Sequence, residues 1–204
     1  MKPKTLFSPH LTFEEAEELI KNGADVNEQN AYQHTPLYFI QSVKIANLLL
    51  ENGANVNHLD NHGRTPLFKV MNKEIAQLFI QYGADVNHID QYKLNALYYI
   101  NQSDIIEVLI QNKADFNVYH EGDLPIDYQV DLKCARVFIK YGSLPGKIIT
   151  YQMFHDLFTK EQQKAFDMFM TITSDDRDFY HMCLAYMNNQ KNNDKIEIKE
   201  MEIL

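Results

Sequence analysis

A repeat of fixed length is the feature that most constrains the fold of this chain. Asn-Gly-Ala-Asp-Val-Asn at residues 22–27 returns at 52–57 and 82–87 with one substitution each, and in a more altered form at 112–117. The interval is 30 residues each time. A second string stays in register with the first, as Thr-Pro-Leu or Asn-Ala-Leu at residues 35–37, 65–67 and 95–97. This pattern predicts stacked copies of one small unit rather than a single central core.

Each string predicts one part of a helix pair. Thr followed by Pro predicts a helix start, since Thr caps free N–H groups and Pro fits the first helical position. A second helix follows, because apolar residues recur at spacings of three and four, as in Ile45, Leu48 and Leu49. The glycines expected to end these helices in a left-handed conformation are Gly23, Gly53 and Gly83. Lys113 replaces this glycine in the fourth copy, so that helix end is expected to be strained or differently closed.

These strings resemble the ankyrin repeat, whose pattern includes Asp-x-x-Gly-x-Thr-Pro-Leu and ends in Gly-Ala-Asp-Val-Asn. The closest unit runs from residues 60–67 to residues 83–87, and the resemblance covers roughly residues 11–146. It implies an all-α solenoid of stacked antiparallel helix pairs, with loops projecting at right angles. The 30-residue period is shorter than the usual ~33 residues. We therefore expect the first helix of each pair, or the turn after it, to be clipped.

The chain is predicted to divide into three parts. An ankyrin repeat domain spans residues 1–146, with a degenerate first repeat at 11–29 and further repeats at about 30–59, 60–89, 90–119 and 120–146. Residues 147–189 are expected to form a helical cap or small helical appendix, because a solenoid must cover its last apolar face. Residues 190–204 are expected to form a flexible tail.

The loop tips are the predicted binding surface. Tyr32, His62 and Tyr92 recur at one position, where the family usually has small polar residues. Exposed tyrosine offers apolar area and a hydroxyl at low entropic cost, which favours recognition of a partner. The alternative is that each side chain only packs on its neighbour in the stack. The predicted partner-binding residues are Tyr32, His34, His62, Arg64, Tyr92 and Lys93.

Two further expectations concern residues near the tips. One aromatic of each pair in the first helix, such as Tyr38 and Phe39, must enter the core while the other extends the binding row. The loop asparagines, whose amides are expected to bond the turn backbone, are Asn27, Asn57 and Asn87. The resemblance adds hydroxylation of these asparagines by the oxygen-sensing asparaginyl hydroxylase of animal cells, should the chain reach such a cytosol.

The sequence favours neither catalysis nor metal binding. His58 and His88 occupy equivalent positions, but neighbouring repeats lie ~10 Å apart and Zn–N bonds are only ~2 Å. His181 and Cys183 are two residues apart, a spacing that does not face one way on a helix. Gly-rich phosphate loops and zinc-protease motifs are missing from the sequence. We therefore expect no enzyme activity, no metal and no cofactor.

The amino-acid composition restricts the kinds of partner and the cellular location that we expect. The net charge of −9 disfavours a nucleic-acid partner, because phosphate binding needs clustered Lys and Arg. No apolar run approaches the length of a membrane span. The two cysteines, Cys134 and Cys183, are expected to be reduced thiols, and the N-terminus lacks the pattern of a secretion leader. These features predict a cytoplasmic monomer.

The family resemblance implies non-catalytic recognition of a partner protein. Short Lys-, Asn- and Ile-rich chains of this type look like those of intracellular bacteria and large DNA viruses, which suggests an effector secreted into a host cell. The alternative is an adaptor whose residues 147–189 recruit a second protein, such as ubiquitin-ligase machinery. Leu144-Pro145 superficially resembles the start of an F-box, although it also matches a decayed repeat loop.

Overall fold

The structure is a computed structural model of the chain, and it describes residues 5–8, 10–118, 120, 123–128 and 132–143. Its elements are, in order, α1 (Phe13–Lys21), η1 (Pro36–Tyr38), α2 (Val43–Glu51), η2 (Pro66–Lys69), α3 (Lys73–Gln81), η3 (Ala96–Tyr98), α4 (Ser103–Gln111), η4 (Pro125–Tyr128) and α5 (Leu132–Lys140), where η denotes a 3-10 helix. The predicted C-terminal helices, the tail, Leu144-Pro145 and Cys183 lie outside the described residues.

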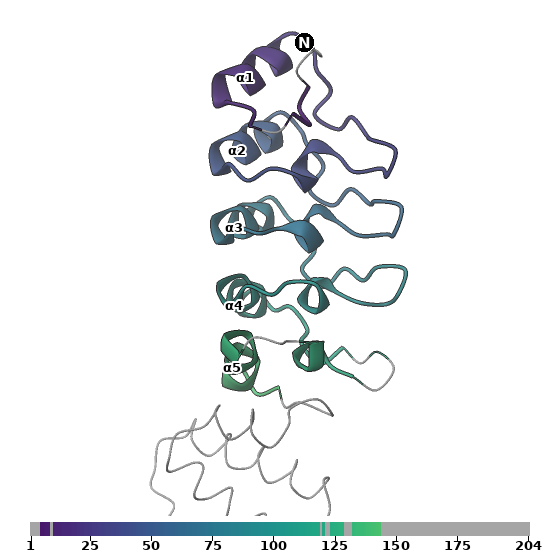
Figure 1. Ribbon diagram of the computed structural model, residues 1–204, viewed down its shortest axis with the longest axis vertical. Coiled ribbons are helices and arrows are strands. Elements are labelled where there is room, and N and C mark those ends of the chain that lie inside the picture. Colours follow the sequence, from purple (N-terminus) through teal and green to yellow (C-terminus); the bar gives the residue numbers. More distant parts are fainter. Residues whose placement is uncertain (1–4, 9, 119, 121–122, 129–131, 144–204) are drawn as a thin grey trace, which may run out of the picture.

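The described elements form a one-dimensional stack. The α-helices lie one below another in a single column, the 3-10 helices form a second column, and the loops project away on the far side (Figure 1). Successive α-helices contact each other, and so do successive 3-10 helices. This arrangement confirms the predicted all-α solenoid of helix pairs with projecting loops.

The first helix of each pair is a single 3-10 turn of three or four residues. This length agrees with the clipping expected from the short period, since each Thr-Pro start leaves few residues before the next α-helix. The predicted capping by threonine is wrong. The hydroxyls of Thr35 and Thr65 are buried and make no hydrogen bond. Asn95 does cap its helix, because its side-chain oxygen accepts from the backbone N–H of Leu97 (3.2 Å).

The core runs along the stack between the two columns. Leu37, Leu67 and Leu97 are buried there as predicted, together with one residue of each first-helix aromatic pair, such as Tyr38. The predicted stripe of α2 needs a correction, because Leu48 is only partly buried while Leu49 is fully buried. Ala46 and Leu50 take the other inward positions on α2, so the buried face is centred one residue further along than the pattern suggested.

Each described α-helix is followed, two residues after its end, by a residue in the left-handed conformation. Gly23, Gly53 and Gly83 have φ values of 84–89°, Lys113 has a φ of 70° and Gly142 a φ of 98°. Lys113 therefore keeps the glycine geometry, and the backbone N–H of Ala114 still donates to the carbonyl of Leu109 (2.9 Å). Of the two expectations for this position, the strained helix end is the one found, because an L side chain is disfavoured at positive φ.

A turn near the N-terminus extends the stack. Within it, the N–H of Ser8 donates to the carbonyl of Thr5 (2.9 Å), 30 residues before the matching bond from Tyr38 to Thr35 (3.1 Å). Leu6 is buried in the core, and the ring of Phe7 meets that of Phe39 edge-on at 6.1 Å. This turn supplies a counterpart of the 3-10 helices and lies upstream of residue 11, where the sequence pattern began.

Candidate interaction surface

The loops are hairpins with a tight turn at their tips, and we call residues 24–34, 54–64 and 84–94 the first, second and third hairpin. In the second hairpin, the Oδ1 of Asp60 accepts from the backbone N–H groups of His62 (2.8 Å) and Arg64 (2.9 Å). The N–H of Asp60 donates to the carbonyl of Arg64 (2.9 Å). Gly63 closes the turn at a φ of 72°. These bonds fix the tip before any partner binds.

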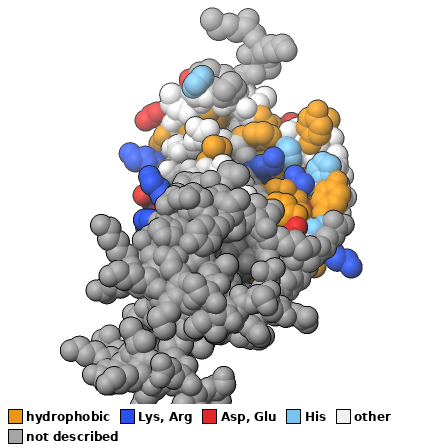
Figure 2. Space-filling view, turned by 60° about the horizontal axis from the view of Figure 1, so that its bottom comes forward, with side chains coloured by type: hydrophobic (Ala, Val, Ile, Leu, Met, Phe, Trp, Pro, Cys, Tyr) orange, Lys and Arg blue, Asp and Glu red, His pale blue; other side chains and the backbone are white. Residues whose placement is uncertain are grey.

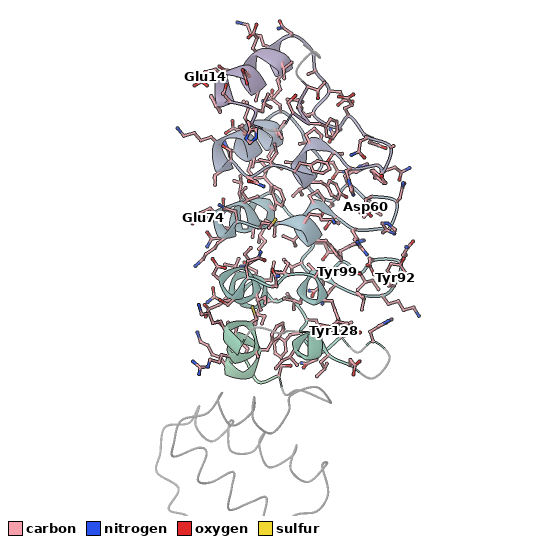
Figure 3. The ribbon with its side chains drawn as sticks, in the orientation of Figure 1. Glu14, Asp60, Glu74, Tyr92, Tyr99 and Tyr128 are labelled. Carbon is pink, nitrogen blue, oxygen red and sulfur yellow. The ribbon has the colours of Figure 1, made fainter. Side chains whose placement is uncertain are left out.

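The tips expose four of the six predicted binding residues. The exposed fraction is 66% for Tyr32 and 48% for Tyr92, and His62 and Lys93 are also exposed. Tyr92 lies on a projecting loop (Figure 3). The rings of His62 and Tyr92 stack with centroids 6.4 Å apart. His62 and Tyr92 therefore contact each other along the stack and still expose part of their surface.

His34 and Arg64 lie elsewhere, between the repeats. Their side chains are only 16% and 18% exposed, and each meets a buried carboxylate of the next hairpin. The Nε2 of His34 lies 3.2 Å from Asp60, and the Nε of Arg64 donates to Asp90 over 3.2 Å. The structure thus separates these two residues from the exposed tips and shows that they link neighbouring repeats.

Arg64, Asp90 and Tyr99 form one network. The hydroxyl of Tyr99 donates to the Oδ2 of Asp90 (2.6 Å), and the guanidinium of Arg64 lies 4.5 Å from the centre of the Tyr99 ring. Burial opposes the charge of Asp90, but bonds from Tyr99, the amides of Leu94 and Tyr92, and Arg64 outweigh it and lower the pKa of this carboxyl. Burial and the neighbouring Asp90 raise the pKa of Tyr99 to about 12.

The loop asparagines join hairpins rather than bonding their own turns, so that expectation is wrong. The Nδ2 of Asn27 donates to the carbonyl of Gly53 (3.0 Å), and its Oδ1 accepts from the N–H of Asn55 (2.8 Å). Asn57 and Asn87 make the same pair of bonds to the hairpin that follows each of them. Both polar atoms of each amide are therefore occupied. Hydroxylation of these three residues stays a prediction.

The two equivalent histidines also join hairpins. The Nε2 of His58 lies 2.9 Å from the carbonyl oxygen of Gln33, and that of His88 lies 2.7 Å from the carbonyl oxygen of Gly63. Each histidine therefore reaches back to the tip of the preceding hairpin. Within the described residues, no group of three or more metal-binding side chains comes together.

Three exposed apolar residues were not among the predicted binding residues. Leu59 is 45% exposed, Ile89 48% and Met71 70%. Leu59 and Ile89 directly precede the tip aspartates at the 30-residue interval, so the repeat register held a signal for them. The side of the molecule that carries the loops shows hydrophobic side chains beside histidine and basic residues (Figure 2). We call the exposed side chains of Tyr32, Phe39, Leu59, His62, Met71, Ile89 and Tyr92 the tip surface.

Charged side chains are exposed on both sides of the stack. Asp60 and Asp90 are buried at the tips, whereas Lys93 at the third tip is exposed, as is Lys69 on η2. Exposed acids are found on the α-helices, as Glu14 and Glu74 show on the side opposite the loops (Figure 3), and also on the hairpins, at Asp25, Glu28 and Asp85.

Comparison with known proteins agrees with this geometry. The family model for ankyrin repeats in three copies matches residues 10–90 and, in an overlapping match, residues 41–120. The chain belongs to the ankyrin repeat family, whose members generally mediate protein–protein interactions and are typically non-catalytic. No curated protein gives a significant match to the chain. Among the described residues, no helix has the length and hydrophobicity that a membrane crossing requires.

Proposed function

We propose that this chain recognises a partner protein through the tip surface, without catalysis. The observation that carries the proposal is the exposure of large apolar side chains on consecutive hairpins, including Tyr32 at 66% and Ile89 at 48%. Apolar and aromatic residues of this kind form the centre of protein interfaces, where their burial stabilises the complex. Lys69 and Lys93 would supply part of the polar rim.

The rigidity of the tips supports the same proposal. Each tip is held by its own turn and by bonds to the next hairpin, such as that from the N–H of Asn61 to the carbonyl of Tyr32 (3.2 Å). A surface that is ordered before binding loses less conformational entropy when the partner arrives. The repeated hairpins therefore form a preorganised row rather than a set of independent loops.

The test combines three substitutions at one tip position, Tyr32→Ala, His62→Ala and Tyr92→Ala. Partners are captured from a lysate with the full-length chain, identified by mass spectrometry, and their affinities measured. We expect the triple variant to bind more than tenfold more weakly. The melting temperature should change little, because substitutions of exposed residues usually shift stability by under about 0.5 kcal/mol.

The matched control places three alanines on the other side of the stack, at Glu14, Glu17 and Glu74, which are exposed on α1 and α3. This variant should keep the affinity of the wild type. Equal affinity of the wild type and the tip variant would overturn the proposal. Loss of the fold in the tip variant would show instead that these residues are structural.

The finer proposal is that the chain acts as a monomeric effector in the cytoplasm of a host cell. It is supported by the composition of the chain and its resemblance to the short ankyrin proteins of intracellular bacteria and large DNA viruses. A fusion to a reporter enzyme that is active only in host cytosol tests it directly. A signal during infection is expected, and a reporter that stays with the producing organism would overturn this role.

A further inference from the structure

Every described junction between hairpins uses the same kind of hydrogen bonds. At the base, an asparagine amide bridges a carbonyl and an N–H of the next hairpin, as Asn27 does with Gly53 and Asn55. At the tip, a backbone N–H of the later hairpin donates to a carbonyl of the earlier one, as from Asn61 to Tyr32. The repeat register therefore identifies which groups of any hairpin in the stack would bond to a hairpin placed before it.

The first hairpin carries the equivalent groups on the side that no described hairpin covers. By the repeat register, they are the carbonyl of Gly23, the N–H of Asp25, the side chain of Asn30 and the N–H of Ala31. Among the described residues, no group bonds to the Gly23 carbonyl, the Asp25 N–H, the Asn30 Nδ2 or the Ala31 N–H. The first hairpin is the topmost of the projecting loops (Figure 1). We call this row the open edge.

The open edge differs from an internal junction at two positions. At both of them, the kind of group that the hairpin would bind is reversed. Asp60 and Asp90 accept from a basic side chain of the preceding hairpin, whereas Asn30 holds this position in the first hairpin. The Oδ1 of Asn30 already accepts from the N–H groups of Tyr32 (2.9 Å) and His34 (3.1 Å). The Nδ2 that remains is a donor and needs an acceptor.

The second difference is at residue 28. His58 and His88 approach a tip carbonyl of the preceding hairpin, but Glu28 occupies the equivalent position of the first hairpin. A carboxylate opposite a carbonyl oxygen is repulsive, and it needs a donor or a cation instead. A further repeat of the internal kind would therefore meet mismatched groups at both positions.

We propose that the open edge binds a hairpin segment of a partner protein, with a backbone carbonyl on the N–H of Ala31, an acidic side chain opposite Asn30 and a basic side chain opposite Glu28. The segment adds to the first hairpin as the hairpins add to one another, through main-chain bonds with side chains setting the charge preference. This site is distinct from the tip surface, because its hydrogen-bonding groups belong to Gly23, Asp25, Asn30 and Ala31, which are not among the residues of the tip surface.

The probe is a synthetic peptide with the sequence of residues 24–34 carrying Gln33→Lys and His34→Glu. Lysine suits that turn position, since Lys93 holds it in the third hairpin with a φ of 61°. The control peptide carries the reversed charges, Gln33→Glu and His34→Lys. Each is titrated into the ¹⁵N-labelled full chain, and the backbone and side-chain amide signals are followed by NMR.

We expect the first peptide to shift the signals of Asp25, Ala31 and the Asn30 side chain, and to bind at least fivefold more tightly than its charge-reversed control. The variant carrying Glu28→His and Asn30→Asp rebuilds an internal junction with residues taken from the second hairpin. This variant should lose the preference for the first charged peptide and should bind the unmodified 24–34 peptide most tightly.

Three results would overturn the proposal. They are equal affinity of the two charged peptides, signal shifts confined to residues away from the open edge, and an unchanged preference in the rebuilt variant. Sedimentation equilibrium of the full chain provides a further check. A dimer that the Glu28→His and Asn30→Asp changes dissociate would show that the occupant is a second copy of the chain rather than a partner segment.

Discussion

Asp90 shows how one side chain serves two repeats. Its Oδ1 closes the tip turn by accepting from the N–H groups of Tyr92 (2.9 Å) and Leu94 (3.1 Å), while its Oδ2 accepts from Arg64 and Tyr99. The carboxyl group is buried, so its charge is stabilised only by these donors. Removing the charge should therefore weaken both the turn and the junction between the second and third hairpins.

The pH dependence of the stability of the variant Asp90→Asn tests this role. Because the folded protein lowers the pKa of Asp90, its contribution is complete above the unfolded value of about 3.9 and is lost as the pH falls through the folded value. We expect the variant to be less stable than the wild type by about 1–3 kcal/mol near pH 7. This difference in the free energy of unfolding should disappear below about pH 4. Urea unfolding at several pH values measures this.

The control for this variant is Asp85→Asn. Asp85 is exposed, and Asn55 stands at its equivalent position, so asparagine fits there. Asn30 shows in the same way that asparagine fits the position of Asp90. A stability gap between Asp90→Asn and the wild type that stays constant down to pH 2 would contradict the role given to the carboxylate.

The α-helices supply about half of the buried apolar side chains of the described residues, and the 3-10 helices, hairpins and turns supply the rest. Helix α2 directs Ile45, Ala46 and Leu49 into the core, and the corresponding positions of α3 are Ile75, Ala76 and Phe79. The small alanine lets neighbouring helices approach, while the larger residues fill the space between the two columns. The stack therefore depends on the inner face of each α-helix.

Two alanine substitutions on α2 should differ clearly in how much they lower the free energy of unfolding. Leu49 is fully buried and Leu48 only partly buried. We expect Leu49→Ala to destabilise the fold by roughly 2–5 kcal/mol, as for other fully buried leucines, and Leu48→Ala to cost less than half as much. Equilibrium urea unfolding of both variants gives the comparison. Equal losses would mean that the two side chains share the core.

In the described part of the chain, the repeats are held together by contacts between neighbours in the stack. Asn57 illustrates the consequence, because it bridges the second and third hairpins through the carbonyl of Gly83 (2.8 Å) and the N–H of Asp85 (2.9 Å). In such a stack, stability is a sum of repeat and junction contributions. A weakened central junction should therefore reduce the cooperativity of unfolding as well as the stability.

Asn57→Ala tests this property of the stack. We expect a loss of about 1–2 kcal/mol from two hydrogen bonds, together with a smaller denaturant m-value because the two halves unfold less cooperatively. The control Asn52→Ala removes an exposed asparagine whose amide donates to the carbonyl of Leu48 within its own repeat. Indistinguishable unfolding curves for the two variants would show that the amide bridges do not couple the repeats.

Much of the architecture follows from the sequence because it depends on local chemistry. The glycine positions predict the left-handed helix ends, the short period predicts clipped first helices, and the buried leucines of the Thr-Pro-Leu strings follow from the same register. The exposure of Tyr32 and Tyr92 also follows from their position at a turn. These features need no knowledge of what lies across a junction.

The hydrogen-bond partners of the polar side chains are decided only by the stacking of the repeats. His34 and Arg64 have the same local context as exposed tip residues, yet each turns toward a buried aspartate of the next hairpin. The asparagine amides likewise bond across the junction, at a separation of 26 residues for Asn27 and Gly53. Such bonds require the three-dimensional register of adjacent hairpins.

The sequence by itself therefore determined the repeat, the helix boundaries and the row of tips, because these arise from short-range conformational preferences. Only the tertiary structure decided which polar groups are used between repeats and which remain free at the first hairpin. The reason is physical. A hydrogen bond between hairpins depends on the distance between two backbones, and that distance is set by the packing of the helix columns.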